Sequence, residues 1–115
     1  MKCLERRNKV VIVIMRVIQR VGSCNWDQLD EIDKKCTVLE DKLGFPPKKR
    51  FRSLTGGYDQ NVVIVEREWK SLAEMEKVVT KAYLTPELVK LYNNSEDIID
   101  WQKMELYVPY PTVPA

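Results

Sequence analysis

The clearest structural signal in this 115-residue chain is the stretch Asn61-Val62-Val63-Ile64-Val65-Glu66-Arg67-Glu68-Trp69-Lys70-Ser71-Leu72. Its first nine residues, 61–69, are rich in β-branched side chains, which favour a strand. Ser71, followed three residues later by Glu74, matches a capping box at a helix start. Beyond it, apolar residues recur at helical spacing, at Leu72, Met75, Val78, Val79 and Ala82. The sequence therefore predicts a strand that leads directly into an amphipathic helix.

Upstream of this stretch, the run Val10–Met15 is apolar at consecutive positions, which predicts a strand covered on both faces. Cys3–Arg7 is either an earlier part of the same strand or a separate short one. Gly22-Ser23 ends the strand. Asn25 is the expected N-cap of a helix of about 18 residues, with one apolar stripe, that starts at Trp26 and stops near Gly44.

Two more strands and a second helical region complete the pattern. Lys48–Thr55 reads as a strand that forms a hairpin with 61–69 through the turn at 56–59. Pro86 starts a shorter helix that continues to Tyr92. Residues 93–95 are expected as a loop, 95–99 as another helical turn and Lys103–Val108 as the final strand, in which apolar and polar residues alternate.

The element order is therefore β-α-β-β-α-β, the ferredoxin-like α+β layout with a four-stranded antiparallel sheet. We expect one domain over residues 1–109 and an extended tail over 110–115. Two helices cover only one face of such a sheet. Because the first and third strands are apolar on both sides, the uncovered face predicts a homodimer in which two sheets pack together.

Composition excludes several classes of function. The net charge of +2 is too balanced to predict nucleic-acid binding. We interpret the basic segment 48–52 as a solvated strand start, with an anion contact as the alternative. Three cysteines (Cys3, Cys24, Cys36) without any histidine argue against a zinc site, and the lack of histidine excludes a histidine-dependent triad. We predict no cofactor, no metal and no nucleic-acid partner.

The same residues suggest a cellular location. An odd number of cysteines with no CxxC pair fits the reducing cytoplasm. The apolar run at 10–15 is shorter than the about 20 residues that cross a bilayer. Arg16 and Arg20 interrupt the region that an export signal would keep apolar. We therefore expect a cytoplasmic protein without a membrane partner.

The element order, the stretch 64–72 and the closing residues Met104-Glu105-Leu106-Tyr107 resemble the dimeric α+β-barrel superfamily. Within it, the chain is most similar to NIPSNAP-type and antibiotic-biosynthesis-monooxygenase-like proteins. The resemblance implies a cavity between sheet and helices or near the dimer centre. In haem-degrading members a tryptophan at the position of Trp69 lines the haem pocket and a histidine ligates iron. This chain has no histidine for the second role, so conventional haem degradation is not expected.

Six strand residues are the candidate ligand-binding set: Trp69, Arg67, Arg52, Glu66, Glu105 and Tyr107. Strand alternation places Glu66 with Glu68 on one face and Arg67 with Trp69 on the other. A charge on the covered face would need a partner, and a Glu–Arg set in a cavity could hold an anion or transfer protons. The alternative is ordinary surface ion pairs for the charges and ordinary core packing for Trp69.

Two functions follow, and the sequence names no catalytic residue for either. The first is a small-molecule-binding or cofactor-independent, monooxygenase-like protein that takes an apolar or aromatic molecule into an internal cavity beside Trp69. The second is a non-catalytic dimeric module for structure or partner binding. An enclosed cavity with a few convergent polar groups would favour the first, and a solidly packed interior would favour the second.

Overall fold

A computed structural model describes residues 11–22 and 25–111 of the chain. It contains the elements β1 (Val13–Val21), α2 (Trp26–Leu43), β2 (Lys48–Arg52), β3 (Val62–Trp69), α3 (Leu72–Tyr83), α4 (Pro86–Glu96) and β4 (Ile99–Tyr107). The expected strand at 3–7 and most of the tail at 110–115 lie outside the described residues. Among those residues, none of the helices has the length and apolar character needed to cross a membrane.

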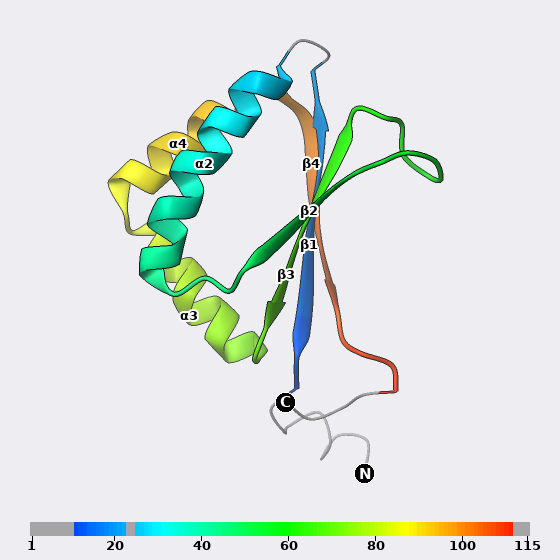
Figure 1. Ribbon diagram of the computed structural model, residues 1–115. Coiled ribbons are helices and arrows are strands. Elements are labelled where there is room, and N and C mark those ends of the chain that lie inside the picture. The colour runs from blue at the N-terminus through cyan, green and yellow to red at the C-terminus, as the bar shows by residue number, and fades with distance from the viewer. Residues whose placement is uncertain (1–10, 23–24, 112–115) are drawn as a thin grey trace.

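The four strands form one antiparallel sheet in the order β2-β3-β1-β4. All three helices lie on the same side of it, so the described part of the molecule has two layers (Figure 1). The predicted α+β class and the four-stranded antiparallel sheet are confirmed. The observed order is β-α-β-β-α-α-β, because the second helical region consists of two separate helices.

The expected boundary signals of the helices have mixed outcomes. Gly44 ends α2 in the left-handed conformation with φ of 97°, and the Ser71 hydroxyl accepts a bond from the Glu74 amide, as predicted. Asn25 precedes α2, but its side chain makes no capping bond.

Three element predictions in the second half of the chain are wrong. The separate helical turn expected at 95–99 does not form, because Ser95 and Glu96 belong to α4 and Ile99 begins β4. Residues 93–95, expected as a loop, belong to α4, which continues to Glu96. The helix continues because Leu91 and Tyr92 pack against the buried Leu88, Ala82 and Cys36, and this packing outweighs the loop preference of Asn and Ser. β4 starts at Ile99 rather than Lys103, because pairing with β1 extends it backwards.

The core lies between the sheet and the helices. One buried group surrounds Trp69 and contains Val13, Met15, Met75 and Val78. A second joins Val21, Leu29 and Val63, and the third joins α2 to α3 and α4. The helices leave the second half of the edge strand β4 uncovered: Met104 and Leu106 pair with Val17 and Met15 of β1 and share their face, yet remain 58% and 44% exposed. Ile99, at the start of β4, packs against the group that contains Leu29 of α2.

The face of the sheet away from the helices is partly covered by the chain itself, which corrects the expectation that only a second subunit covers it. The β2–β3 connection projects to that side (Figure 1). Its Tyr58 ring lies 6.0 Å from the Trp101 ring, and Asp59 pairs with Arg20 at 3.1 Å. Ile18 and Val62 on this face are only 2% and 0% exposed.

Candidate functional site: a buried ionic cluster between α2 and the sheet

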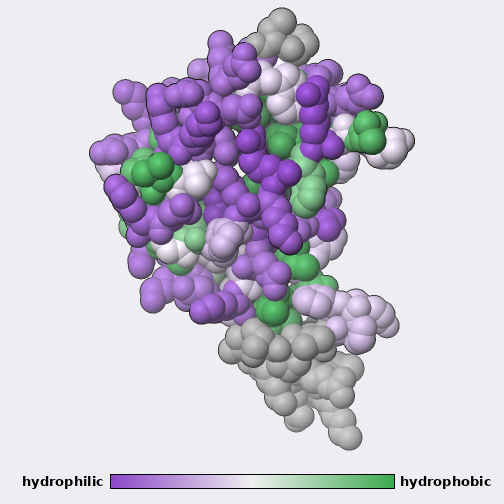
Figure 2. Space-filling model, viewed as in Figure 1, coloured by the Kyte–Doolittle hydropathy of each residue, from purple (hydrophilic) through white to green (hydrophobic). Residues whose placement is uncertain are grey.

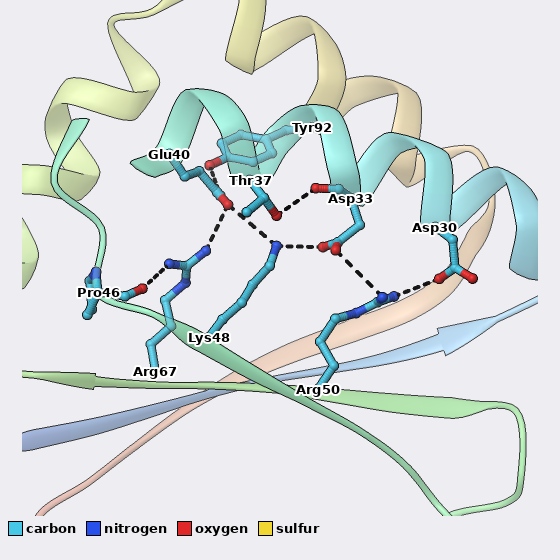
Figure 3. Close-up of polar contacts among 9 residues, drawn as sticks. All are labelled: Asp30, Asp33, Thr37, Glu40, Pro46, Lys48, Arg50, Arg67 and Tyr92. Carbon is cyan, nitrogen blue, oxygen red and sulfur yellow. Dashed lines mark hydrogen bonds and ion pairs between the residues drawn. The ribbon is translucent and has the colours of Figure 1, made fainter. Parts of the chain in front are cut away.

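A cluster of charged and polar side chains lies between α2 and the strands β2 and β3. Figure 3 shows the acidic side chains of α2 pointing toward the sheet and the basic side chains of the strands pointing toward the helix. The residues drawn are Asp30, Asp33, Thr37, Glu40, Pro46, Lys48, Arg50, Arg67 and Tyr92. Helices and strands are brought together here by charge as well as by apolar packing.

Glu40 is the centre of the cluster. It is 6% exposed and lies on the buried side of α2 with Leu29 and Cys36. Its Oε1 accepts a bond of 2.7 Å from Arg67 Nη2, and its Oε2 accepts one of 2.6 Å from the Tyr92 hydroxyl. Both carboxylate oxygens are therefore engaged, which is what a buried charge requires.

Arg67 enters the cluster from β3. Strand alternation places it on the face of Trp69, as the sequence predicted, and the structure shows that this face is turned toward the helices. Besides its bond to Glu40, it donates from Nη1 to the Pro46 carbonyl at 2.6 Å. Its guanidinium also lies 4.7 Å from the centre of the Phe45 ring. A carboxylate, a carbonyl and an aromatic ring thus surround this buried cation.

The basic segment of β2 supplies the rest of the cluster. Lys48 Nζ lies 2.6 Å from Asp33 Oδ1 and 3.6 Å from Glu40 Oε1. Arg50 lies 3.0 Å from Asp30 and 3.6 Å from Asp33. Three cations therefore face three carboxylates. Lys48 and Arg50 are paired with carboxylates of α2, while β2 is exposed from Lys49 to Arg52, in agreement with the solvated strand start that the sequence suggested.

Two ionisable groups beside Glu40 have shifted pKa values. Burial, followed by the hydrogen bond to Glu40, raises the pKa of the Tyr92 hydroxyl far above its usual range. Burial, followed by the nearby Glu40 carboxylate, raises the pKa of the Cys36 thiol to about 11. Both groups stay protonated at neutral pH, so Tyr92 keeps donating to Glu40 and Cys36 is an unreactive core thiol.

Trp69 lies next to this cluster. It is 1% exposed, and Phe45 meets its ring edge to face with centroids 5.5 Å apart. The indole Nε1–H is buried without a hydrogen-bond partner among the described residues. The structure thus places Trp69 in the packed core, with its own indole N–H left as an unused hydrogen-bond donor among the described residues.

The other four candidate residues do not join Trp69 and Arg67. Glu66, Glu105 and Tyr107 lie on the opposite face of the sheet, where Arg16 bonds Glu66 at 2.8 Å and lies 5.0 Å from the Tyr107 ring. Tyr107 donates to Glu105 at 2.6 Å. Arg52, at the end of β2, stacks on the Trp26 ring at 4.2 Å. The candidate set is therefore divided among three places.

Sequence reasoning missed Glu40 and Tyr92. Glu40 carried a recognisable signal, because it is four residues after Cys36 and four before Gly44, on the side of the helix that the apolar stripe marks as buried. Tyr92 carried none, since its role depends on where α4 lands against α2. Among the described residues, no three Cys, Asp or Glu side chains are grouped as a metal site would need.

Comparisons with known proteins show which solved structures share the fold of this chain. No family model matches the chain, and no curated protein does. Solved structures do match. A NIPSNAP family protein from Agrobacterium tumefaciens aligns with a TM-score of 0.73 and 13% identity, over 87% of each chain.

Two further structures carry enzyme names. SnoaB, a cofactor-independent oxygenase from Streptomyces nogalater, aligns with a TM-score of 0.68 and 10% identity, over 90% of this chain and 98% of its own. A protein from Nitrosomonas europaea, named as a candidate antibiotic biosynthesis monooxygenase, aligns with a TM-score of 0.61 and 15% identity, over 91% and 97%. At these identities the likeness concerns the fold. This chain therefore has the dimeric α+β-barrel fold of NIPSNAP-family and antibiotic-biosynthesis-monooxygenase structures.

Proposed function

We propose that this chain is a homodimeric, non-catalytic binding module built on the dimeric α+β-barrel fold. One observation carries the proposal: the space between sheet and helices beside Trp69 is filled by the chain's own side chains. Trp69 is 1% exposed, Arg67 4% and Met75 7%. The side chains best suited to chemistry there, Glu40 and Arg67, are bonded to each other.

The chemistry of the cluster agrees with a structural role. A general base needs a lone pair that can reach a substrate proton. Both oxygens of Glu40 already accept bonds from Arg67 and Tyr92. The cluster holds α2 and α4 to the sheet. We further expect the single domain over 1–109 to act in the cytoplasm.

The surface for the second subunit is the part of the outer sheet face that the β2–β3 connection leaves open. Phe51 and Tyr107 are 49% and 41% exposed there. Arg16, Glu66 and Glu105 supply both signs of charge on the same face. A two-fold interface brings each patch against its own copy, so a patch with both signs can pair with itself.

Light scattering at micromolar concentration tests the dimer. We expect twice the chain mass for the parent protein and a monomer for Phe51→Glu, because the new charge would be buried at the interface. Leu84→Glu is the matched control, since Leu84 is 76% exposed at the end of α3 on the helical side. The proposed dimer through the outer sheet face is contradicted if the parent is a monomer, or if both variants dissociate equally.

The second candidate function is binding or oxidation of a small apolar or aromatic molecule next to Trp69. The unpartnered Trp69 indole N–H, next to the Phe45 ring, favours it, and SnoaB is an oxygenase of the same fold. Native mass spectrometry of protein purified from its own host separates the two functions. A bound organic molecule that is lost in Trp69→Phe but kept in Trp101→Phe would support the second function. A measured mass that corresponds to the chain alone, with no bound molecule, supports the non-catalytic binding module.

A further inference from the structure

A hollow of about 560 Å³ lies on the outer side of the helical layer, between α2 and α4. Its lining residues come from both helices: Lys35, Val38, Leu39, Glu87, Lys90, Leu91 and Asn94. It is separate from the ionic cluster, which faces the sheet. In Figure 2 the helical side of the molecule is mainly hydrophilic, so an apolar trough between two helices is unusual there.

The floor of the hollow is apolar. Leu39 and Leu91 are half-buried and pack against the core group that contains Cys36 and Leu88. Val38 beside them is 56% exposed. A β-branched apolar side chain at an exposed helix position is favoured neither by helix propensity nor by contact with water. The floor therefore offers apolar surface that is continuous with the core.

The walls carry positive charge from both sides. Lys35 belongs to α2 and Lys90 to α4, and both are exposed. Within the described ranges neither ammonium has a carboxylate oxygen within 4.0 Å, whereas Lys48 and Arg50 each have two such partners. Glu87 is the one acidic residue of the lining. A ligand that complements the charge of this hollow is therefore an anion.

Size favours a small molecule over a protein segment. Small-molecule sites have volumes of roughly 300–1,000 Å³ and are mostly apolar, with a few polar groups. A stable protein partner covers about 800 Å² on each side, more than seven lining residues provide. We propose that this groove binds a free single-chain fatty carboxylate, with its head group between Lys35 and Lys90 and its chain along Val38, Leu39 and Leu91.

Calorimetric titration of the full chain with decanoate, kept below the concentration at which it forms micelles, tests the proposal. We expect saturable binding, and binding at least about tenfold weaker in the double variant Lys35→Gln/Lys90→Gln, since both charge-assisted contacts are lost. Lys77→Gln/Lys81→Gln on α3 is the matched control and should bind like the parent. Val38→Asp should also weaken binding, because it places a negative charge on the apolar floor.

Three results would overturn the proposal: binding unchanged in Lys35→Gln/Lys90→Gln, equal binding of decyltrimethylammonium, or no saturable binding of decanoate. Light scattering on the same double variant shows whether the groove is instead an interface between copies. If that variant becomes a monomer, the groove belongs to the dimer and the fatty carboxylate is excluded. If it stays a dimer and still binds decanoate like the parent, the ligand site fails while the proposed dimer through the sheet stands.

Discussion

Glu40 on α2 and Arg67 on β3 are 27 positions apart in the chain, and their side chains meet at 2.7 Å with only 8% and 5% of each side chain exposed. This pair connects the helical layer to the middle of the sheet. Each partner also binds a second group, Tyr92 for Glu40 and the Pro46 carbonyl for Arg67. The pair is therefore the point at which α2, α4, the α2–β2 connection and β3 are joined.

Breaking this pair should destabilise the fold strongly. Arg67→Met removes the nearest cation of the buried Glu40 carboxylate and leaves only Lys48 Nζ, at 3.6 Å. Removing one partner of a comparable buried pair costs about 3–5 kcal/mol. Arg50→Met is the matched control, because Arg50 belongs to the same cluster but its partner Asp30 is 51% exposed, and it should cost less than about 1 kcal/mol. Urea unfolding followed by circular dichroism measures both. Equal losses in the free energy of unfolding for the two variants would show that the buried pair contributes no more to stability than the exposed one.

The Tyr92 hydroxyl should stabilise the fold through Glu40. Tyr92→Phe removes the 2.6 Å bond to Glu40 Oε2 and keeps the ring in the core. A hydrogen bond to a charged group contributes about 1.5–3 kcal/mol, so we expect a loss in that range. Tyr110→Phe, at a position that is 98% exposed, should leave the free energy of unfolding unchanged. A Tyr92→Phe protein as stable as the parent would contradict this role.

Stability should fall at alkaline pH, in part through Cys36. Its pKa is raised from 9.0 to about 11 in the folded chain, by burial first and then by Glu40. Between these values the unfolded thiol has lost its proton and the folded one has kept it, so the free energy of unfolding decreases as pH rises. The contribution is fully present below pH 9.

Urea unfolding across this pH range, compared with Cys36→Ser, isolates the thiol. The serine variant should be less stable at neutral pH but should lose less stability between pH 9 and about 11. Tyr92 adds a loss of the same sign at higher pH, because its pKa is raised as well. Parallel pH profiles for the two proteins would rule out the Cys36 contribution.

The left-handed backbone conformation at the end of α2 should require glycine at position 44. Its φ of 97° lies in the left-handed region, where a Cβ costs about 1–2 kcal/mol. Gly44→Ala should lower the free energy of unfolding by that amount, although nothing lies within 4 Å of the added Cβ. Gly57→Ala is the control, since its position is equally open and its φ is not positive. Thermal unfolding of both variants measures the difference.

The cap of α3 should contribute more than the residue before α2. Ser71 accepts a bond of 3.1 Å from the Glu74 amide, so Ser71→Ala should cost about 0.5–2 kcal/mol. Asn25 makes no such bond, so Asn25→Ala should change stability by a smaller amount. Chemical denaturation of the two variants decides the comparison. A larger loss for Asn25→Ala would contradict the assignment of the caps.

Features that depend on near neighbours in the chain were predictable from the residues alone. The strand at 61–69, the helix from Trp26 to Gly44 and the cap at Ser71 were all readable, because periodicity and capping act over a few residues. Alternation also placed Arg67 with Trp69 on one face and Glu66 on the other, but only the structure shows that the face of Arg67 is the covered one. The α+β class followed from the order of these elements.

Contacts between side chains that are distant in the chain became visible only in the folded arrangement. Glu40 meets Arg67 and Tyr92 because α2 packs against β3 on one side and α4 on the other, and the loop preference of residues 93–95 yielded to the packing of α4. The contacts of the β2–β3 connection, Tyr58 with Trp101 and Asp59 with Arg20, were equally invisible in the sequence. Such contacts depend on the relative placement of whole elements, and the local preferences that a sequence displays carry no information about that placement.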